Sequence, residues 1–187
     1  MSNHTQYDQV AIRFLSCIDL KDMPKTEQQR GLLILFYLAA VIDEGVYNFG
    51  ELIAHDILTT LKGTYKEWLV DLLYAFNSGD IDNIIGLKDK WSTQPDMKIN
   101  ELVTRNKINL LCLMEMTFQR PATDTQRTFD SIAQTVKINT DLVELLVMKA
   151  VRLGLVRESI DEIEQKCHMT WVQPKGSQTD FRHADSP

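Results

Sequence analysis

The chain has 187 residues, of which 44% are hydrophobic, and carries 20 Lys and Arg against 26 Asp and Glu, a formal net charge of −6. This length and composition allow a sizeable core in one domain or two small ones and exclude a mainly disordered chain. The acidic balance disfavours a protein that binds nucleic acid through its phosphates. The apolar run from Leu32 to Ile42 is too short to cross a bilayer and favours a buried helix.

The N-terminus and the cysteines indicate the compartment. The first residues, MSNHTQYDQV, lack the basic start and apolar stretch of a secretory signal. Cys17, Cys112 and Cys167 are odd in number, far apart and on apolar segments, which favours reduced core thiols over a disulfide framework. The sequence therefore predicts a protein of the cytoplasm and nucleus.

The first two thirds of the chain, residues 1 to 121, read as successive amphipathic helices without an alternating strand pattern. We expect a mainly α architecture in which these helices form an array. The predicted helices cover residues 6 to 20, 25 to 44, 50 to 62, 64 to 77, 80 to 91 and 98 to 118.

The stretch TYKEWLVDLLYAFNSGD carries the clearest helical pattern. Thr64 and Glu67 fit a capping box at its start, Gly79 suits a left-handed residue at its end, and Asp80 suits the N-cap of the next helix. So tight a turn predicts two antiparallel helices. The apolar face is predicted from Tyr65, Trp68, Leu69, Leu72, Leu73 and Phe76.

After Pro121 the pattern changes to that of a winged helix, over residues 122 to 174. A short helix is expected from Phe129 to Val136, then the turn KINT, then a helix from Asp141 to Leu153 that ends at Gly154. The segment KCHMTWV alternates as a strand, with Cys167, Met169 and Trp171 on one face and His168, Thr170 and Val172 on the other, and LVRESI is its expected hairpin partner. Residues 175 to 187 are polar and expected to be disordered.

The helix-turn-helix is a poor match to a nucleic-acid reader. Residues 122 to 173 hold 6 basic and 8 acidic side chains. On the second helix, one arc carries balanced charge together with Leu145 and Met148. These two side chains either pack against the preceding helices or contact another protein. The charged members of the arc are Asp141, Glu144, Lys149 and Arg152.

No local pattern predicts catalysis, a metal or a cofactor. The stretch from Gly45 to Gly50 continues with Glu51 and Leu52, which excludes a phosphate-binding loop of the GxxxxGK[ST] type. The pair His55 and Asp56 favours a capping or solvated role over acid-base chemistry. The histidines have no zinc-site spacing, and they are His4, His55, His168 and His183. Met114 and Met116 favour the core over an adaptable interface.

Four blocks carry a resemblance: LLYAFNSGD, LLCLMEMTFQRP, LVELLVMKAVRLGLV and IDEIEQKCHMTWVQP. From about Tyr7 to Pro174, the chain resembles PCI-domain proteins, in particular those of the 26S proteasome lid, and HMTWVQP is the most specific block. The resemblance implies a right-handed helical-repeat array that ends in a winged helix. It also implies a scaffold without a catalytic centre, which associates with other PCI-containing lid subunits in ubiquitin-dependent proteolysis.

Relatives of this type usually have further repeats before, and a long helix after, the region seen here, so the chain is expected to be truncated at both ends. The predicted protein interface comprises Leu145 and Met148 of the second helix and the backbone of an edge strand, either Cys167 to Val172 or its hairpin partner. Two alternatives stay open: a nucleic-acid-binding winged helix, and a PCI scaffold of the signalosome or of a translation initiation factor. The strand part of the predicted interface is Cys167, His168, Met169, Thr170 and Val172.

Overall fold

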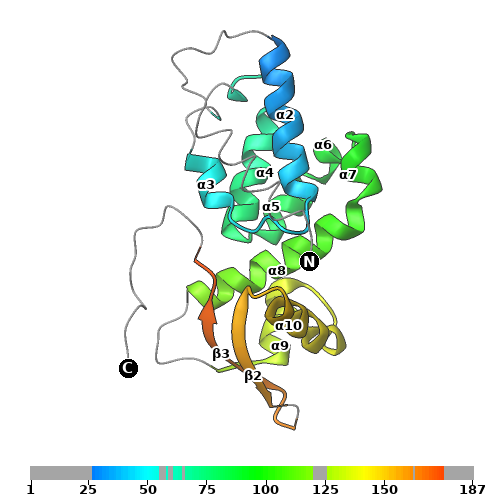
Figure 1. The fold of residues 1–187 in the computed structure, drawn as a ribbon. Coiled ribbons are helices and arrows are strands. Elements are labelled where there is room, and N and C mark those ends of the chain that lie inside the picture. The colour runs from blue at the N-terminus through cyan, green and yellow to red at the C-terminus, as the bar shows by residue number, and fades with distance from the viewer. Residues whose placement is uncertain are drawn as a thin grey trace.

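The computed structural model describes residues 27–54, 58, 61–64, 66–119, 126–161 and 163–174. The helix predicted at 6 to 20, Cys17, the pair His55 and Asp56, and the predicted tail lie outside these residues. The described chain is mainly α with a small antiparallel sheet, as predicted. A helical segment lies at one end, a winged helix at the other, and the long helix α8 crosses between them (Figure 1).

The helical segment consists of short and medium helices. Of the predicted helix at 50 to 62, the described α-helical part reaches Ala54, where the description pauses, and the helix predicted at 80 to 91 is interrupted at Leu87. Near this interruption the Trp91 indole nitrogen donates to the Ile84 carbonyl at 3.2 Å, which stabilises the bend. The bounds are α2 Glu27–Ile42, α3 Phe49–Ala54, α4 Glu67–Ser78, α5 Ile81–Gly86, α6 Lys88–Trp91, α7 Pro95–Ile99 and α8 Glu101–Phe118.

The start of α4 differs from the prediction, and its end agrees. The predicted capping box is wrong: Lys66 is the N-cap and makes no side-chain capping bond. The Thr64 hydroxyl instead donates to the Leu61 carbonyl at 2.6 Å and accepts from the Lys66 amide at 3.3 Å, so it stabilises the turn before the helix. The predicted face is buried wherever it is described, at Trp68, Leu69, Leu72, Leu73 and Phe76, while Tyr65 lies outside the described residues.

The turn between α4 and α5 follows the predicted pattern. Gly79 has a φ of 62°, and the Asp80 amide bonds to the Ala75 carbonyl at 3.0 Å. The Asp80 carboxylate accepts from the Asn83 amide at 3.0 Å and so caps α5. A Cβ atom at Gly79 would lie 2.9 Å from Cys112 Cα, so only glycine lets this turn lie directly on α8.

Helix α8 lies in the middle of the core. It packs against α2, α4 and α5 on one side and against α9, α10 and β3 of the winged helix on the other. Met114 is 1% exposed and Met116 is half-buried against the core, which confirms the core interpretation. Cys112 and Cys167 are buried thiols that are not joined in a disulfide, as predicted for these two cysteines.

Lys107 of α8 is buried at 2% exposure and connects α8 to the end of α2. Its ammonium group donates to the carbonyls of Ala40 at 2.7 Å and Asp43 at 2.5 Å. These carbonyls lie where the last turn of α2 lacks intrahelical partners and carries partial negative charge. The ring centres of Phe49 and Tyr47 lie 4.9 and 5.7 Å from the same nitrogen, so the cation is surrounded by favourable groups.

The winged helix follows the predicted order with one additional strand. The short strand β1 was not predicted, and it pairs with β3 from Lys166 to His168. The strand order β1-β3-β2 makes β3 central, so the prediction that it is an edge strand is wrong over that stretch. The elements are β1 Gln126–Thr128, α9 Phe129–Val136, a 3-10 turn Thr140–Leu142, α10 Val143–Arg152, β2 Val156–Asp161 and β3 Lys166–Val172.

A β-bulge changes the predicted alternation along β3. Glu158 of β2 pairs with Met169 and Arg157 pairs with Trp171, which leaves Thr170 without a partner residue across the strand. The Thr170 hydroxyl donates to the Arg157 carbonyl at 3.2 Å and stabilises the bulge. The predicted common face of Cys167, Met169 and Trp171 therefore ends at Met169, and Trp171 is 37% exposed.

Candidate docking surface

Helix α10 has one face in the core. Val143, Leu146, Val147 and Ala150 are buried, and the helix packs against α8, α9 and β2. The buried positions recur at a spacing of three and four residues, which is the pattern of a helix with a single core-facing side. Gly154 follows with a φ of 72°, and the chain turns directly into β2.

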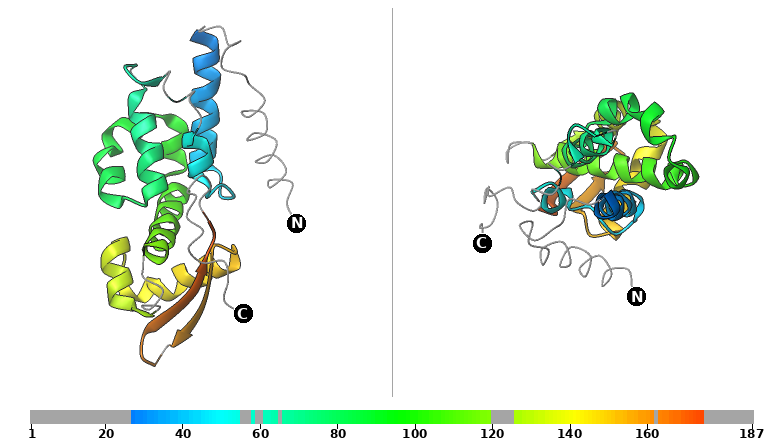
Figure 2. Two further views of the ribbon diagram at one scale, coloured as in Figure 1. Left: turned by 90° about the vertical axis from the view of Figure 1, so that its left-hand side faces the viewer. Right: turned by 90° about the horizontal axis from the view of Figure 1, so that it is seen from above.

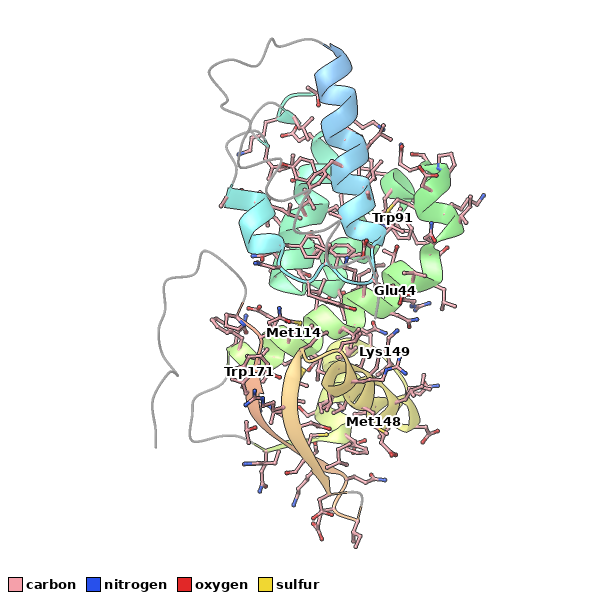
Figure 3. All side chains as sticks on the ribbon, in the orientation of Figure 1. Glu44, Trp91, Met114, Met148, Lys149 and Trp171 are labelled. Atoms are coloured by element: carbon pink, nitrogen blue, oxygen red, sulfur yellow. The ribbon has the colours of Figure 1, made fainter. Side chains whose placement is uncertain are left out.

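The opposite face of α10 is apolar and exposed. Leu145 is 66% exposed and Met148 is 55% exposed, so the alternative that they pack against the preceding helices is wrong. In Figure 3, Met148 and Lys149 extend from α10 away from β2 and β3. Leu142, Val151 and Leu153 add to the exposed apolar area. We call Leu142, Leu145, Met148, Val151 and Leu153 the α10 surface.

Charge along α10 changes sign from one end to the other. Asp141 and Glu144 lie at its start, whereas Lys149 and Arg152 lie in its last turn. The cations are balanced by the anions, so this helix does not supply the cationic excess that phosphate binding requires. Its outward side is suited to an apolar contact with flanking ion pairs.

The predicted strand residues lie in different environments. Cys167 and Met169 are in the core at 0% and 1% exposure, His168 and Val172 are half-buried, and Thr170 is exposed. Because the core side of α10 packs on β2, the α10 surface faces away from the sheet. In the side view of Figure 2, the helices and strands of the winged helix lie together at the end of the molecule opposite the start of α2. The structure does not bring the two parts of the predicted interface together.

Residue Cys167 has the environment of an inert thiol. Burial, the nearby charge of Glu158 and a hydrogen bond to that carboxylate raise the pKa of Cys167 to about 12. Burial also raises the pKa of Glu158, although the hydrogen bond from Cys167 opposes the shift. At neutral pH the thiol is protonated and is a poor nucleophile.

Further exposed groups were not predicted. Ile163 is 93% exposed at the tip of the β2-β3 hairpin, and the Arg157 guanidinium lies 5.1 Å from the centre of the Trp171 ring. An apolar residue between two acidic ones in a hairpin turn is the sequence signal that points to an exposed Ile163.

Ile99 and Leu102, at the corner between α7 and α8, are 80% and 73% exposed. An open hollow on the outer side of the sheet is polar and is lined by Gln126, Ser159, Asp161, Lys166 and His168 among others.

Within the described ranges, no group of three or more His, Cys, Asp or Glu is arranged to hold a metal ion. None of the helices described there is long and apolar enough to span a membrane.

Comparison with known families matches the two halves of the chain separately. The model of the PSD13 N-terminal repeats matches residues 1–73, and the PCI domain model matches residues 87–171. The chain thus carries both parts in order, the PSD13 N-terminal repeats and then a PCI domain. The PCI match extends from α6 through the winged helix to β3, so the α10 surface lies within the PCI domain. The resemblance seen in the sequence blocks is confirmed.

Curated relatives match most of the chain. The 26S proteasome non-ATPase regulatory subunit 13 of Dictyostelium discoideum is 36% identical over 93% of this chain and 46% of its own length. The probable 26S proteasome regulatory subunit rpn9 of Schizosaccharomyces pombe is 36% identical over 93% of this chain and 45% of its own length. The subunit 13 homolog B of Arabidopsis thaliana is 39% identical over 74% and 37%. The chain spans less than half the length of these relatives.

Proposed function

We propose that the chain is a non-catalytic scaffold of the proteasome regulatory lid, in the cytoplasm and nucleus, and that its PCI domain binds neighbouring PCI subunits. The names of the relatives and the PCI domain support this assignment. The observation that carries it is the α10 surface, where Leu145 and Met148 are exposed on the second helix of the helix-turn-helix. Covering such a surface with a partner protein removes apolar area from water.

The edge of the sheet offers a second contact. With the order β1-β3-β2, β2 has one side without a neighbouring strand among the described residues. A strand of a neighbouring subunit could bond to its free backbone groups. Of the two strands that the sequence left open, β3 and its hairpin partner, this proposal takes the partner, β2.

Affinity purification of the tagged chain from cells tests the proposed function. We expect PCI subunits of the proteasome lid to co-purify, and we expect the variant with Leu145→Asp and Met148→Asp to lose them. Two carboxylates in the centre of an apolar interface would be buried without partners. Leu35→Asp is the matched control, because Leu35 is 59% exposed but lies on α2, outside the residues that match the PCI domain. Circular dichroism should show that all variants keep their helices.

Other results would contradict the proposal. Capture of signalosome or initiation-factor subunits in place of lid subunits would assign the scaffold to another complex. Tight, salt-sensitive binding of RNA or DNA in a gel-shift titration, without capture of lid subunits, would favour the nucleic-acid alternative.

A further inference from the structure

The outward side of α10 is symmetric in its chemistry. Measured from the midpoint between Leu146 and Val147, each acidic residue has a basic residue at the same distance on the other side, and each exposed apolar residue between Leu142 and Val151 has an apolar counterpart. A second copy of the helix laid antiparallel to the first would therefore place acidic residues against basic ones and apolar residues against apolar ones. The symmetric pairs are Asp141 with Arg152, Leu142 with Val151, Glu144 with Lys149, and Leu145 with Met148.

These pairs share the side of the helix that is free of the core. At about 100° per residue, Leu145, Met148 and Arg152 of α10 lie along one line, directly opposite the buried face, and Asp141 precedes this line in the 3-10 turn Thr140–Leu142. All four are exposed. From Asp141 to Arg152 the order is acidic, apolar, apolar, basic, and Glu144, Lys149 and Val151 of α10 flank the line.

From this symmetry we propose that α10 packs against α10 of a second copy of the chain, antiparallel, about a two-fold axis at the helix midpoint. The proposal rests on the proposed function, because it takes the α10 surface as a protein docking site and names a partner for it. Leu145 would contact Met148 of the second copy, and Asp141 would pair with Arg152 of the second copy. In a two-fold arrangement each of these contacts forms twice.

Charge sets the direction of the pair. A parallel arrangement would place Asp141 against Asp141 and Arg152 against Arg152, whereas the antiparallel one pairs opposite charges and opposes the two helix dipoles. The helix's own dipole also favours acidic residues at the start and basic residues at the end. That preference accounts for the charges alone, and it leaves the exposure of Leu145 and Met148 to be explained by a partner.

The size of one helix face limits the affinity. A single helix pair buries less area than a standard protein interface, so we expect a dissociation constant on the order of 10 to 100 µM. Pairing with a second copy would therefore give way to a larger contact with a neighbouring subunit, which would use the same surface.

Sedimentation equilibrium of the full 187-residue chain, from about 1 µM to 1 mM, tests the pairing. We expect a monomer-dimer equilibrium. Arg152→Asp should raise the dissociation constant about tenfold or more, because two symmetric attractions become repulsions. Asp141→Arg should have the same effect, and the double variant with both changes should dimerise again, since the charges are merely exchanged. Leu35→Asp should dimerise as the unchanged chain does.

The double variant separates pairing from a general loss of helix, because it carries both unfavourable charges at the helix ends and still restores the complement. A chain that stays monomeric at 1 mM, or a dimer that ignores the single reversals or is not restored by the exchange, would overturn the pairing. Such a chain could still capture lid subunits through Leu145 and Met148, which would leave the proposed function standing. A dimer that captures no lid subunit would support the pairing and contradict the proposed function.

Discussion

Helices α8 and α10 differ in which kinds of side chain they bury and which they leave exposed. Helix α8 buries the charged Lys107 at 2% exposure, while α10 leaves Leu145 at 66% exposure. The difference follows from position, because α8 lies between the helical segment and the winged helix, and α10 lies on the outside of the molecule (Figure 1). What surrounds a helix decides which of its residues are buried, and the residue type alone does not.

The buried charge on α8 and the exposed leucine on α10 depend on different physical conditions. A buried ammonium group is stable only where acceptors replace its water, and the carbonyls of Ala40 and Asp43 do so. An exposed leucine needs no acceptor, but several together favour contact with another surface. Changes in α8 should therefore affect folding, and changes on the outward side of α10 should affect association.

Truncation of one leucine in each helix gives the largest expected difference. Leu111 of α8 is fully buried, so Leu111→Ala should lower the free energy of unfolding by about 3 kcal/mol through lost burial and a cavity. Leu145→Ala should change it by less than about 0.5 kcal/mol. Urea denaturation followed by circular dichroism measures both. Similar losses in the two variants would show that the α10 surface is part of the fold.

Gly79 and Gly154 have similar backbone conformations but different surroundings. Replacing each by alanine therefore separates the cost of backbone strain from the cost of a steric clash. Gly79→Ala should cost about 2 kcal/mol or more, because the new Cβ would meet α8 at Cys112 and the residue keeps a φ of 62°. Gly154→Ala, at a φ of 72° with nothing near the new Cβ, should cost only the backbone term of about 1 kcal/mol. Equal losses, measured by the same denaturation, would argue against a close approach of the α4-α5 turn to α8.

Replacing Lys107 by methionine tests the buried cation. Lys107→Met should lower the free energy of unfolding by about 1.5 kcal/mol, since two carbonyls lose a charged donor while the cost of burying a charge is also removed. Lys88→Met is the control. Lys88 forms an exposed ion pair with Glu101 at 2.5 Å, and water screens such a pair, so its loss should change stability much less. A stabilised Lys107→Met variant would mean that desolvation outweighs the hydrogen bonds.

The sequence predicted those parts of the fold that depend on local pattern. The end of α4 at Gly79, the cap at Asp80 and the helix from Phe129 to Val136 follow from residue type and spacing alone. Strand β1 could not be predicted, because three residues without alternation are held only by pairing with distant β3. The bulge at Thr170 depends in the same way on the partner strand.

The docking surface was predicted only in part. Periodicity showed that Leu145 and Met148 share an arc with charged residues, but it could not decide whether another helix covers them. That depends on the tertiary position of α10, and the exposed fractions supply it. A two-stranded hairpin left open whether β3 or its partner offers the free edge, and the third strand, β1, rules out β3 where the two pair.

The pH dependence of stability gives the smallest expected effect and belongs to the winged helix. Burial raises the folded-state pKa of Glu158 above its ordinary value, so the folded chain binds a proton more readily than the unfolded chain. Its contribution to stability is therefore present at low pH and is lost as pH rises from about 4.3 through the folded pKa.

Glu158→Gln removes this titration and keeps an acceptor for the Cys167 thiol. The variant should be more stable than the unchanged chain at pH 8, by less than about 1 kcal/mol because the side chain is only half-buried, and the difference should vanish toward pH 4. Thermal denaturation of both chains across this range would show converging stability curves. Parallel curves would mean that Glu158 has the same pKa in the folded and unfolded chain, and that water reaches the inner side of the sheet.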